Sequence, residues 1–330
     1  MTALLLIGAL VLIVVAAELF TNAVEWAGYL LRLGTGATGS LLAALGTALP
    51  ETVVVVVALL GGAAQSDRIA AGAVLGSSFL LLTLGGAVTG AAALARRDGR
   101  RLQAEASQVR RDLGTFLSAF GCAVASSLVD RPQRVVIGVL LLLLYAGYAG
   151  GTLREKGKEG RMPEPLHFVR WRTDPPPGAV VAIQLIVAVA LLVVSSDLFV
   201  HGLQGAASSL GIDPLILAVI IVPFATELPE AANSAIWVHA RDDGLALGNV
   251  FGAAAFQACI LGFVGISFTS WDPKHLGAAG LISAGCAFGA GLYLLGVLRR
   301  GQAHGGWLLV AALPWVGYAA AALALHGRLG

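Results

Sequence analysis

The sequence predicts an all-α membrane protein in which ten transmembrane helices form two inverted repeats of five. Of its 330 residues, 57% are hydrophobic and only 12% are charged, whereas soluble domains carry about 25% charged residues. The charges cluster between apolar runs of about 18 residues or more, each long enough to cross a hydrocarbon core of roughly 30 Å. A motif near residue 50 also recurs near residue 229. These three observations predict the fold class.

Ten apolar runs are counted, and they cover residues 3–31, 37–62, 68–93, 112–129, 133–150, 178–209, 213–239, 244–268, 275–298 and 305–326. The recurring motif divides them into five plus five. An odd number of spans per half forces the halves to insert with opposite orientation, so the repeat is predicted to be inverted. The first repeat is assigned to residues 1–150, a linker to 151–177 and the second repeat to 178–330.

The basic residues predict the orientation of the chain. Sixteen of the 21 Lys and Arg residues follow spans one, three, five, seven and nine. The positive-inside rule places these loops and the linker in the cytoplasm and both termini outside, as expected for a multi-pass protein of the plasma membrane. Within the linker, Phe168 and Trp171 lie among arginines. This pattern fits a segment at the headgroup level or a solvated linker.

The central motif is Gly46-Thr47-Ala48-Leu49-Pro50-Glu51, in the middle of the apolar run 37–62. Pro50 is expected to free the carbonyl group of Gly46 and to bend the helix, because proline lacks an amide hydrogen and clashes with the carbonyl group four residues earlier. Glu51 follows directly. An ionised side chain at this depth costs about 2.5–3.5 kcal/mol. Glu51 is therefore expected to be paired, protonated or bound to a cation.

A similar motif, Ala225-Thr226-Glu227-Leu228-Pro229-Glu230, occurs within the apolar run 213–239. A shift of 179 residues, the difference between 230 and 51, superposes the two Pro-Glu pairs and also brings Glu18 onto Asp197. Two broken helices with carboxylates at matching positions of an internal repeat indicate the ion site of a secondary transporter. Glu51 and Glu230 are therefore predicted to converge near the middle of the membrane.

Glu18 and Asp197 each begin a polar stripe on one face of a long helix. Residues Thr21, Asn22 and Glu25 continue the first stripe at helical spacing, and His201, Gln204 and Ser208 continue the second. Two interpretations stay open with equal weight. The stripes line two half-channels that form a permeation path, or they are interfacial groups bonded to neighbouring helices.

At these two motifs the chain resembles the cation/calcium exchanger superfamily, which includes the sodium/calcium exchangers and carries Gly-Thr-Ser-x-Pro-Glu in each of two inverted repeats. The segments Gly72–Ser78 and Gly248–Ala254 resemble the family's Gly-Asn-x-x-Gly-Ser-Asn. The resemblance implies that Glu51 and Glu230 hold the cation and that Thr47 and Thr226 lie beside it. Further candidates for the ion site are Ser77, Gln257, Gly46 and Ala225.

The chain also departs from the family pattern. The serine before Leu-Pro-Glu is replaced by Ala48 in the first repeat and by Glu227 in the second, and Leu81 occupies a position where the sodium/calcium exchangers place Asn or Asp. Glu227 and Glu230 are three residues apart, so they share one helix face. The predicted metal ligands are therefore Glu51, Glu230 and Glu227.

Ligands that are all oxygen atoms suit hard cations such as Ca²⁺ or Na⁺. His201 and His239 are expected to be a stripe member and a helix-end group rather than ligands, and the three cysteines lack metal-ligand spacing. No resident cofactor is expected. The expected partners are inorganic cations and the lipid bilayer, with no nucleic acid and with the chain as a monomer.

The function that fits best is a secondary active antiporter that exchanges Ca²⁺ or a similar divalent cation for Na⁺ or H⁺ by alternating access. A monovalent cation/proton antiporter is the first alternative, favoured by the lost side-chain ligands. An intramembrane hydrolase with Glu227 and Glu230 as its acid/base pair is disfavoured, because the chain has no nucleophile dyad, His-Glu-x-x-His or phosphate-binding loop. The protein is therefore not expected to be an enzyme. The intact Pro-Glu pairs argue against a scaffold without transport activity.

Overall fold

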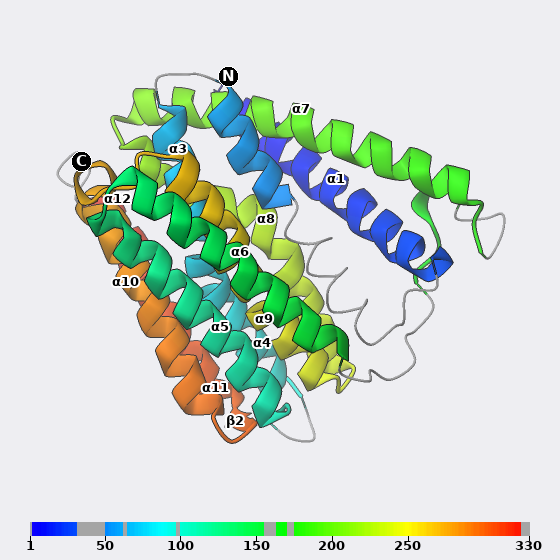
Figure 1. The fold of residues 1–330 in the computed structure, drawn as a ribbon. Helices are drawn as coiled ribbons and strands as arrows, with labels where there is room; N and C mark the ends of the chain where they lie inside the picture. The colour runs from blue at the N-terminus through cyan, green and yellow to red at the C-terminus, as the bar shows by residue number, and fades with distance from the viewer. Residues whose placement is uncertain are drawn as a thin grey trace.

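The computed structural model describes residues 2–31, 50–61, 65–96, 100–154, 163–169 and 175–324 (Figure 1). Apart from two short strands, the regular structure of these residues is helical. The elements are α1 (Thr2–Leu30), a helix at Pro50–Leu60, α3 (Ser66–Leu80), the π-helical turn η1 (Leu81–Gly85), α4 (Gly86–Leu94), β1 (Arg101–Gln103), α5 (Ala106–Ala125), η2 (Ser126–Leu128), α6 (Arg131–Arg154), η3 (His167–Val169), α7 (Gly178–Leu210), α8 (Pro214–His239), α9 (Asp243–Phe268), α10 (Pro273–Leu298), β2 (Gln302–His304), α11 (Gly305–Leu309), η4 (Val310–Ala312) and α12 (Leu313–Ala324).

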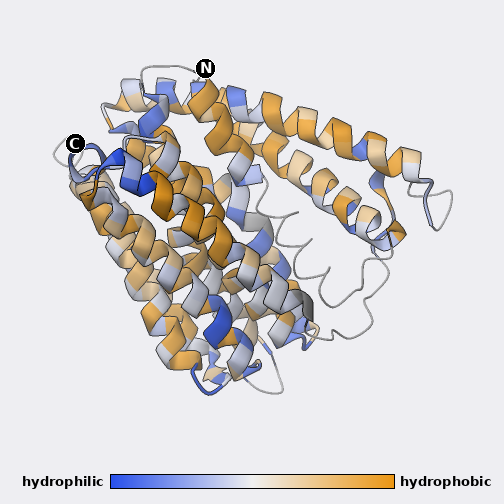
Figure 2. Cartoon of the chain, in the orientation of Figure 1, coloured by the Kyte–Doolittle hydropathy of each residue, from blue (hydrophilic) through white to orange (hydrophobic). Residues whose placement is uncertain are grey.

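The continuous helix formed by α3, η1 and α4 lies at the centre of the bundle together with α9. In the most apolar stretch of each, 94% and 83% of the residues are buried, against 28% for α1 and for α7. Large apolar side chains of the outer helices are exposed, among them Leu4, Leu143 and Ile186. Most hydrophilic residues lie toward the ends of the bundle (Figure 2). An apolar exterior around a packed centre is the arrangement expected in a lipid bilayer.

Seven helices among the described residues are long and apolar enough to cross a membrane, and each lies in a predicted span. They are Leu4–Leu30, Ser66–Leu94, Arg131–Thr152, Gly178–Leu210, Asp243–Phe268, Pro273–Leu298 and Gly305–Ala322. α5, α8 and the helix Pro50–Leu60 overlap the three remaining predicted spans. The chain is therefore an all-α membrane protein, as predicted, whereas the count of ten crossings and the inverted repeat remain predictions.

The ends of some helices differ from the predicted spans. α5 begins at Ala106, six residues before the predicted start at 112, and α6 continues to Arg154, four residues into the predicted linker. The first turns of α5 contain Arg110 and Arg111, which interrupt the apolar run without interrupting the helix. Hydropathy locates the lipid-facing part of a helix, and a helix can extend beyond it into polar surroundings.

The predicted break in the second motif is not observed, because α8 is helical without interruption from Pro214 to His239. Proline removes one N–H group and displaces one carbonyl group, which bends a helix more readily than it ends one. In the first motif the described residues begin at Pro50, so the predicted break at Gly46–Leu49 lies outside them.

α3 packs against α8 with almost no space between the two backbones. A Cβ atom added to Gly76 would lie 2.6 Å from the carbonyl oxygen of Val219, and one added to Gly72 would lie 2.5 Å from that of Leu215. Pro223 cannot donate to the carbonyl group of Val219, four residues earlier. Gly76 thus lets α3 approach the carbonyl group that Pro223 leaves without its intrahelical donor, as small residues do between membrane helices.

Gly76→Ala is therefore expected to destabilise the protein by about 1–3 kcal/mol, because the new methyl group would overpack the α3–α8 contact. Gly289→Ala in α10 is the matched control, since a Cβ atom there meets nothing within 4 Å. The control should be neutral or stabilising by up to about 1 kcal/mol, the helix preference of alanine over glycine. Thermal unfolding in detergent measures both, and equal effects would mean that α3 moves away from α8 without loss.

Two ion pairs fix the ends of the central helix. Arg68 near the start of α3 pairs with Asp213 before α8, and Arg96 after α4 pairs with Asp243 at the start of α9. Arg96 also donates to the carbonyl oxygen of Val238. Beside the second pair, β1 and β2 form a small antiparallel sheet (Figure 1). These contacts hold the central helix in register with α8 and α9.

α1 and α7 form an antiparallel pair that crosses the rest of the bundle at an angle (Figure 1). Gly202 near the end of α7 lies against Leu5 and Leu6 of α1, whereas Gly178 at its start lies near Leu30. Among the helices labelled in Figure 1, α8 makes the main contact with this pair. The two long helices are thus packed more extensively on each other than on any other labelled helix.

Candidate cation-binding site

Three carboxylates are buried at the centre of the bundle. Glu51 lies in the helix Pro50–Leu60, and Glu227 and Glu230 lie in α8. Their exposed fractions are 0%, 0% and 1%. The carboxylate of Glu51 faces the side chains of Glu227 and Gln257 and lies within electrostatic reach of Glu230. The structure therefore brings together the acidic residues of both sequence motifs.

Glu227 points into this cluster and is held there by side-chain donors. The amide nitrogen Nε2 of Gln257 donates to its Oε2 at 2.9 Å, and the hydroxyl group of Thr226 donates to its Oε1 at 3.2 Å. His201 is exposed on α7, where its ring bonds to the carbonyl oxygen of Asp197. Glu227 is therefore oriented by polar neighbours in the core and does not pair with that histidine.

Glu51 has a different environment. Neither of its carboxylate oxygens has a hydrogen-bond partner among the described residues, although both are buried. A buried charge without a partner is strongly unfavourable, and native proteins neutralise it with a proton, a counter-charge or a metal ion. The Glu51 carboxylate is thus the group in this cluster with an unfilled requirement for a proton or a cation.

Polar side chains from α3 and α9 complete the surroundings of the carboxylates. Ser77 lies within hydrogen-bonding range of Glu227, although its hydroxyl group also donates to the carbonyl oxygen of Ala73 at 3.0 Å. Ser78 donates to the amide oxygen of Gln257 at 3.4 Å. Thr226 also donates weakly to the carbonyl oxygen of Val222. Each of these side chains carries an oxygen atom that a hard cation accepts as a ligand.

The backbone beside the cluster is irregular on the α3 side. The helix changes to π-helical geometry at Leu81–Gly85, directly after the segment with Ser77 and Ser78. Single π-helical turns inside α-helices are frequent at functional sites. Leu81 is fully buried in this turn. An apolar side chain therefore occupies the position where, by the family resemblance, the sodium/calcium exchangers place Asn or Asp.

Several predicted site residues are placed elsewhere or not described. Gly46 and Thr47 lie outside the described residues, and Ala225 is described only as part of the α8 backbone. Glu18 is 62% exposed on α1 and contacts His167, and Asp197 is 53% exposed on α7 and contacts His201. The half-channel role of Glu18 and Asp197 remains a prediction.

No three His, Cys, Asp or Glu side chains in the described part of the chain are close enough to hold one metal ion together. Ca²⁺ takes six to eight oxygen ligands, which include amide and hydroxyl oxygens, backbone carbonyls and water besides carboxylates. Glu51, Glu227 and their polar neighbours offer such a mixed set. The chemistry of these donors therefore fits a transported hard cation better than a permanently bound transition metal.

Two residues near the site were not identified from the sequence. The amide nitrogen of Asn249 donates to the carbonyl oxygen of Glu230 and to the hydroxyl oxygen of Ser234, both at 3.2 Å, and so ties α9 to α8 beside the carboxylates. Pro223 of α8 lies against Gly76 of α3, at the close contact between these two helices. Asn249 stands in the Gly-Asn segment that carries the family resemblance, which was a signal for it. Pro223 has no counterpart in the first motif.

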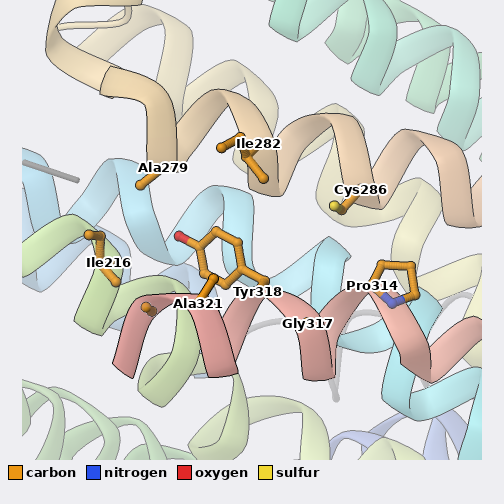
Figure 3. A pocket seen from close by; sticks show the side chains of 9 residues that line it. Ile216, Ala279, Ile282, Cys286, Pro314, Gly317, Tyr318 and Ala321 are labelled. Carbon is orange, nitrogen blue, oxygen red and sulfur yellow. The ribbon is translucent and has the colours of Figure 1, made fainter. Parts of the chain in front are cut away.

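A separate cavity of about 280 Å³ lies between α8, α10 and α12 (Figure 3). Its walls are almost entirely apolar and carry no carboxylate; they consist of Ile216, Ala279, Ile282, Cys286, Pro314, Gly317, Tyr318, Ala321 and Ala322. A hard cation requires oxygen ligands. The cavity is therefore unsuited to an ion and is distinct from the carboxylate cluster.

The model of the family described as sodium/calcium exchanger protein matches residues 1–153 and 180–324, which is most of the chain. The chain belongs to this family. A curated exchanger relative, named as the antiporter CaxA of Alkalimonas amylolytica, is 28% identical over 323 residues and is aligned over 94% of both chains. Membership of a transporter family agrees with a membrane transporter rather than an enzyme.

Three solved structures share the fold. An H⁺/Ca²⁺ exchanger called CAX is 18% identical with a TM-score of 0.78, covering 99% of this chain and 86% of its own. YfkE is 19% identical with a TM-score of 0.72, covering 99% and 93%. The sodium-calcium exchanger NCX_Mj is 19% identical with a TM-score of 0.62, covering 97% and 99%. At these identities the likeness concerns the fold alone.

Proposed function

We propose that this exchanger-family chain is a secondary active antiporter that exchanges Ca²⁺, or a similar divalent cation, for H⁺. The observation that carries the proposal is the buried pair of facing carboxylates, Glu51 and Glu227, with Glu230 nearby. Two facing carboxylates in a desolvated site cannot both remain charged without a cation, and a proton is the smallest group that relieves them. Binding of Ca²⁺ and of H⁺ is therefore mutually exclusive at this pair.

The ligand set supports the divalent cation. Glu227 is oriented by Gln257 and Thr226, and Ser77 adds an oxygen from α3. Hard oxygen donors and a net negative charge favour Ca²⁺. Two of the similar proteins agree in class, since one solved structure is named as an H⁺/Ca²⁺ exchanger and the curated relative as an antiporter.

We further propose that the protein has ten transmembrane helices in two inverted repeats, with the linker in the cytoplasm of a plasma membrane and both termini outside. Alternating access would then arise from movement of α1 and α7 against the other helices. The support is that α1 and α7 pack more extensively on each other than on α8, the labelled helix that contacts the pair most. Such a pair can slide while the carboxylates stay on α8 and the helix Pro50–Leu60.

Flux in proteoliposomes tests the proposed exchange. Purified protein should accumulate radioactive Ca²⁺ inside vesicles with an acidic interior, and a protonophore should abolish this accumulation. An outward Na⁺ gradient at equal pH on both sides should not drive uptake. Uptake driven by Na⁺ alone would replace H⁺ by Na⁺ as the counter-ion. Absence of Ca²⁺ uptake under both gradients would reject the proposal.

A further inference from the structure

A short segment of the linker, residues 163–169, is packed against one end of the α1–α7 pair, and we call this segment the strap. It ends in the 3-10 turn η3. Leu166 is only 2% exposed and forms a small apolar cluster with Ala23 and Trp26 of α1 and Val181 of α7. The side chain of Leu166 is thus buried between α1 and α7. The strap is therefore neither a solvated linker nor a segment that only rests among lipid headgroups.

Three hydrogen bonds bind the backbone of the strap to α1. The indole nitrogen of Trp26 donates to the carbonyl oxygen of Glu164 at 2.7 Å, and the amide nitrogen of Asn22 donates to the same oxygen at 3.3 Å. The amide oxygen of Asn22 accepts from the backbone N–H of His167 at 3.2 Å. Trp26 is fully buried and Asn22 is 4% exposed. These side chains therefore recognise the backbone of the strap.

Gln184 binds the strap to α7 and at the same time joins α7 to α1. Its amide oxygen accepts from the backbone N–H of Phe168 at 3.1 Å. Its amide nitrogen donates to the carbonyl oxygen of Leu19 at 2.9 Å and to the amide oxygen of Asn22 at 3.0 Å. Gln184 has no exposed surface. One buried side chain thus contacts all three segments.

These polar side chains are buried in two mainly apolar helices, where an unsatisfied amide would be strongly unfavourable. Without the strap, the amide oxygen of Gln184 and the indole nitrogen of Trp26 would lose the partners described above. A fully bonded buried network specifies one arrangement of the segments that it joins. The network therefore requires α1, α7 and the strap to be present together in one geometry.

We propose that the strap ties α1 and α7 into a single body, and that Asn22 and Gln184 are positioning residues that make the two helices move together during transport. The inference rests on the proposed function, because it assigns a role to the pair in alternating access. Both helices must change position for the site to open on one side and close on the other. A tie between their ends keeps the two movements in step.

Hydrogen exchange of the strap tests the tie directly. Pro163 and Pro165 have no amide hydrogen, so a peptide over residues 163–169 reports on few amides, among them those of His167 and Phe168 that donate to Asn22 and Gln184. Exchange should be slow in the intact protein. Protection, meaning the slowing relative to the intrinsic exchange rate at the same pH, should be equal in saturating Ca²⁺ and in Ca²⁺-free buffer at low pH. Gln184→Met should raise the exchange rate of the strap amides by about two- to tenfold. The variant removes the hydrogen bond from the Phe168 N–H to Gln184 and the one from Gln184 to Asn22.

Transport by the same variant gives the second measurement. Gln184→Met should lower the turnover of Ca²⁺ uptake by about two- to tenfold and leave the half-saturating Ca²⁺ concentration unchanged, because the carboxylates are untouched. Ser195→Ala is the matched control. Ser195 is also buried in α7, but its hydroxyl group donates only to the carbonyl oxygens of Leu191 and Leu192 in the same helix. The control should change neither turnover nor strap exchange.

Three outcomes would overturn the tie. Rapid exchange of the strap in the intact protein would show that it is not bound. Protection that disappears in one of the two ion conditions would make the strap a lid rather than a tie. Faster exchange in Gln184→Met with unchanged turnover would show that coupling is not needed. Failure of the proposed function is a separate result, seen as absent Ca²⁺ flux in the intact protein while strap exchange remains measurable.

Discussion

Glu51→Gln is expected to abolish Ca²⁺ exchange and to leave the protein at least as stable as the original. The Glu51 carboxylate is fully buried, and neither of its oxygens makes a hydrogen bond of good geometry with the described residues. The substitution keeps the shape of the side chain but removes a charged ligand, and a contact to a charged group is worth about 1.5–3 kcal/mol. Affinity for Ca²⁺ should therefore fall by about ten- to more than a hundredfold.

The stability prediction separates Glu51 from an ordinary buried carboxylate. Removing an unpartnered charge relieves its desolvation, and the new amide can donate to Glu227, which Glu51 faces. Asp112→Asn is the matched control, because Asp112 is 2% exposed but is bonded to the hydroxyl group of Tyr148 at 3.0 Å and to Arg111 at 3.3 Å. This control should lose stability and keep its Ca²⁺ affinity.

Both variants are compared by Ca²⁺ uptake in proteoliposomes and by thermal unfolding in detergent. Normal uptake by Glu51→Gln would show that the cation binds elsewhere. A large loss of stability in the same variant would show that Glu51 has a structural role. The combination of lost transport and retained stability is expected only for a charge that is kept to bind an ion.

The fold class and the acidic centre of the site could be predicted from the sequence because both are local signals. Runs of apolar residues locate the helices, and a Pro-Glu pair within such a run is conspicuous wherever it lies. The repeat of this pair in Glu51 and Glu230 indicated where the two halves meet. Glu227 was identified in the same way, since a carboxylate in an apolar run must have a reason to be there.

The remaining features depend on contacts between residues far apart in the chain. Gln257 lies 30 positions after Glu227, and Gln184 lies 162 positions after Asn22. Hydropathy cannot show which distant partner satisfies a buried amide. The polar stripe that includes Asn22 was interpreted from helical spacing as a half-channel wall or as interfacial groups bonded to neighbouring helices. In the structure Asn22 is bonded to Gln184 of the neighbouring helix α7, as in the second interpretation, and it also binds the strap. Spacing shows which residues share a face, but packing shows what that face contacts.

The continuity of α8 has the same kind of explanation. From sequence alone, Pro229 was expected to break the helix, yet α8 continues through it and through Pro223. Pro223 leaves the carbonyl group of Val219 without its intrahelical donor. Gly76 of α3, a different helix, approaches this carbonyl group. Whether a proline ends a helix depends on whether its surroundings accommodate the freed carbonyl group, and those surroundings are tertiary.

The second large effect is expected for Glu227, the carboxylate that replaces a serine of the family pattern. With all three carboxylates ionised the empty site has a charge of −3, and Ca²⁺ leaves −1. In the absence of Ca²⁺, protons are the expected balance for the charge of the carboxylates, because neighbouring buried carboxylates titrate as a coupled set. Protons and Ca²⁺ then compete, so Ca²⁺ binding should weaken as the pH falls and strengthen as it rises.

Glu227→Gln and Glu227→Ser should each flatten this pH dependence, because the site then has one carboxylate fewer at which protons compete with Ca²⁺. The Gln variant keeps the side-chain volume, so it tests the charge alone. The Ser variant also removes the contact with Gln257, which donates to Glu227 at 2.9 Å. Gln257→Leu is the matched control, since it removes that donor and leaves all three carboxylates in place. It should keep a steep pH profile, displaced along the pH axis because ionised Glu227 loses a donor.

Ca²⁺ uptake measured from about pH 6 to pH 9, the range over which coupled buried carboxylates can titrate, decides between these expectations. If the profiles of the two Glu227 variants coincide with that of the original protein, Glu227 does not couple Ca²⁺ to H⁺. If they flatten while Gln257→Leu stays steep, the charge of Glu227 sets the proton dependence. The position of Glu227, buried opposite Glu51 and oriented by Gln257 and Thr226, predicts the second result.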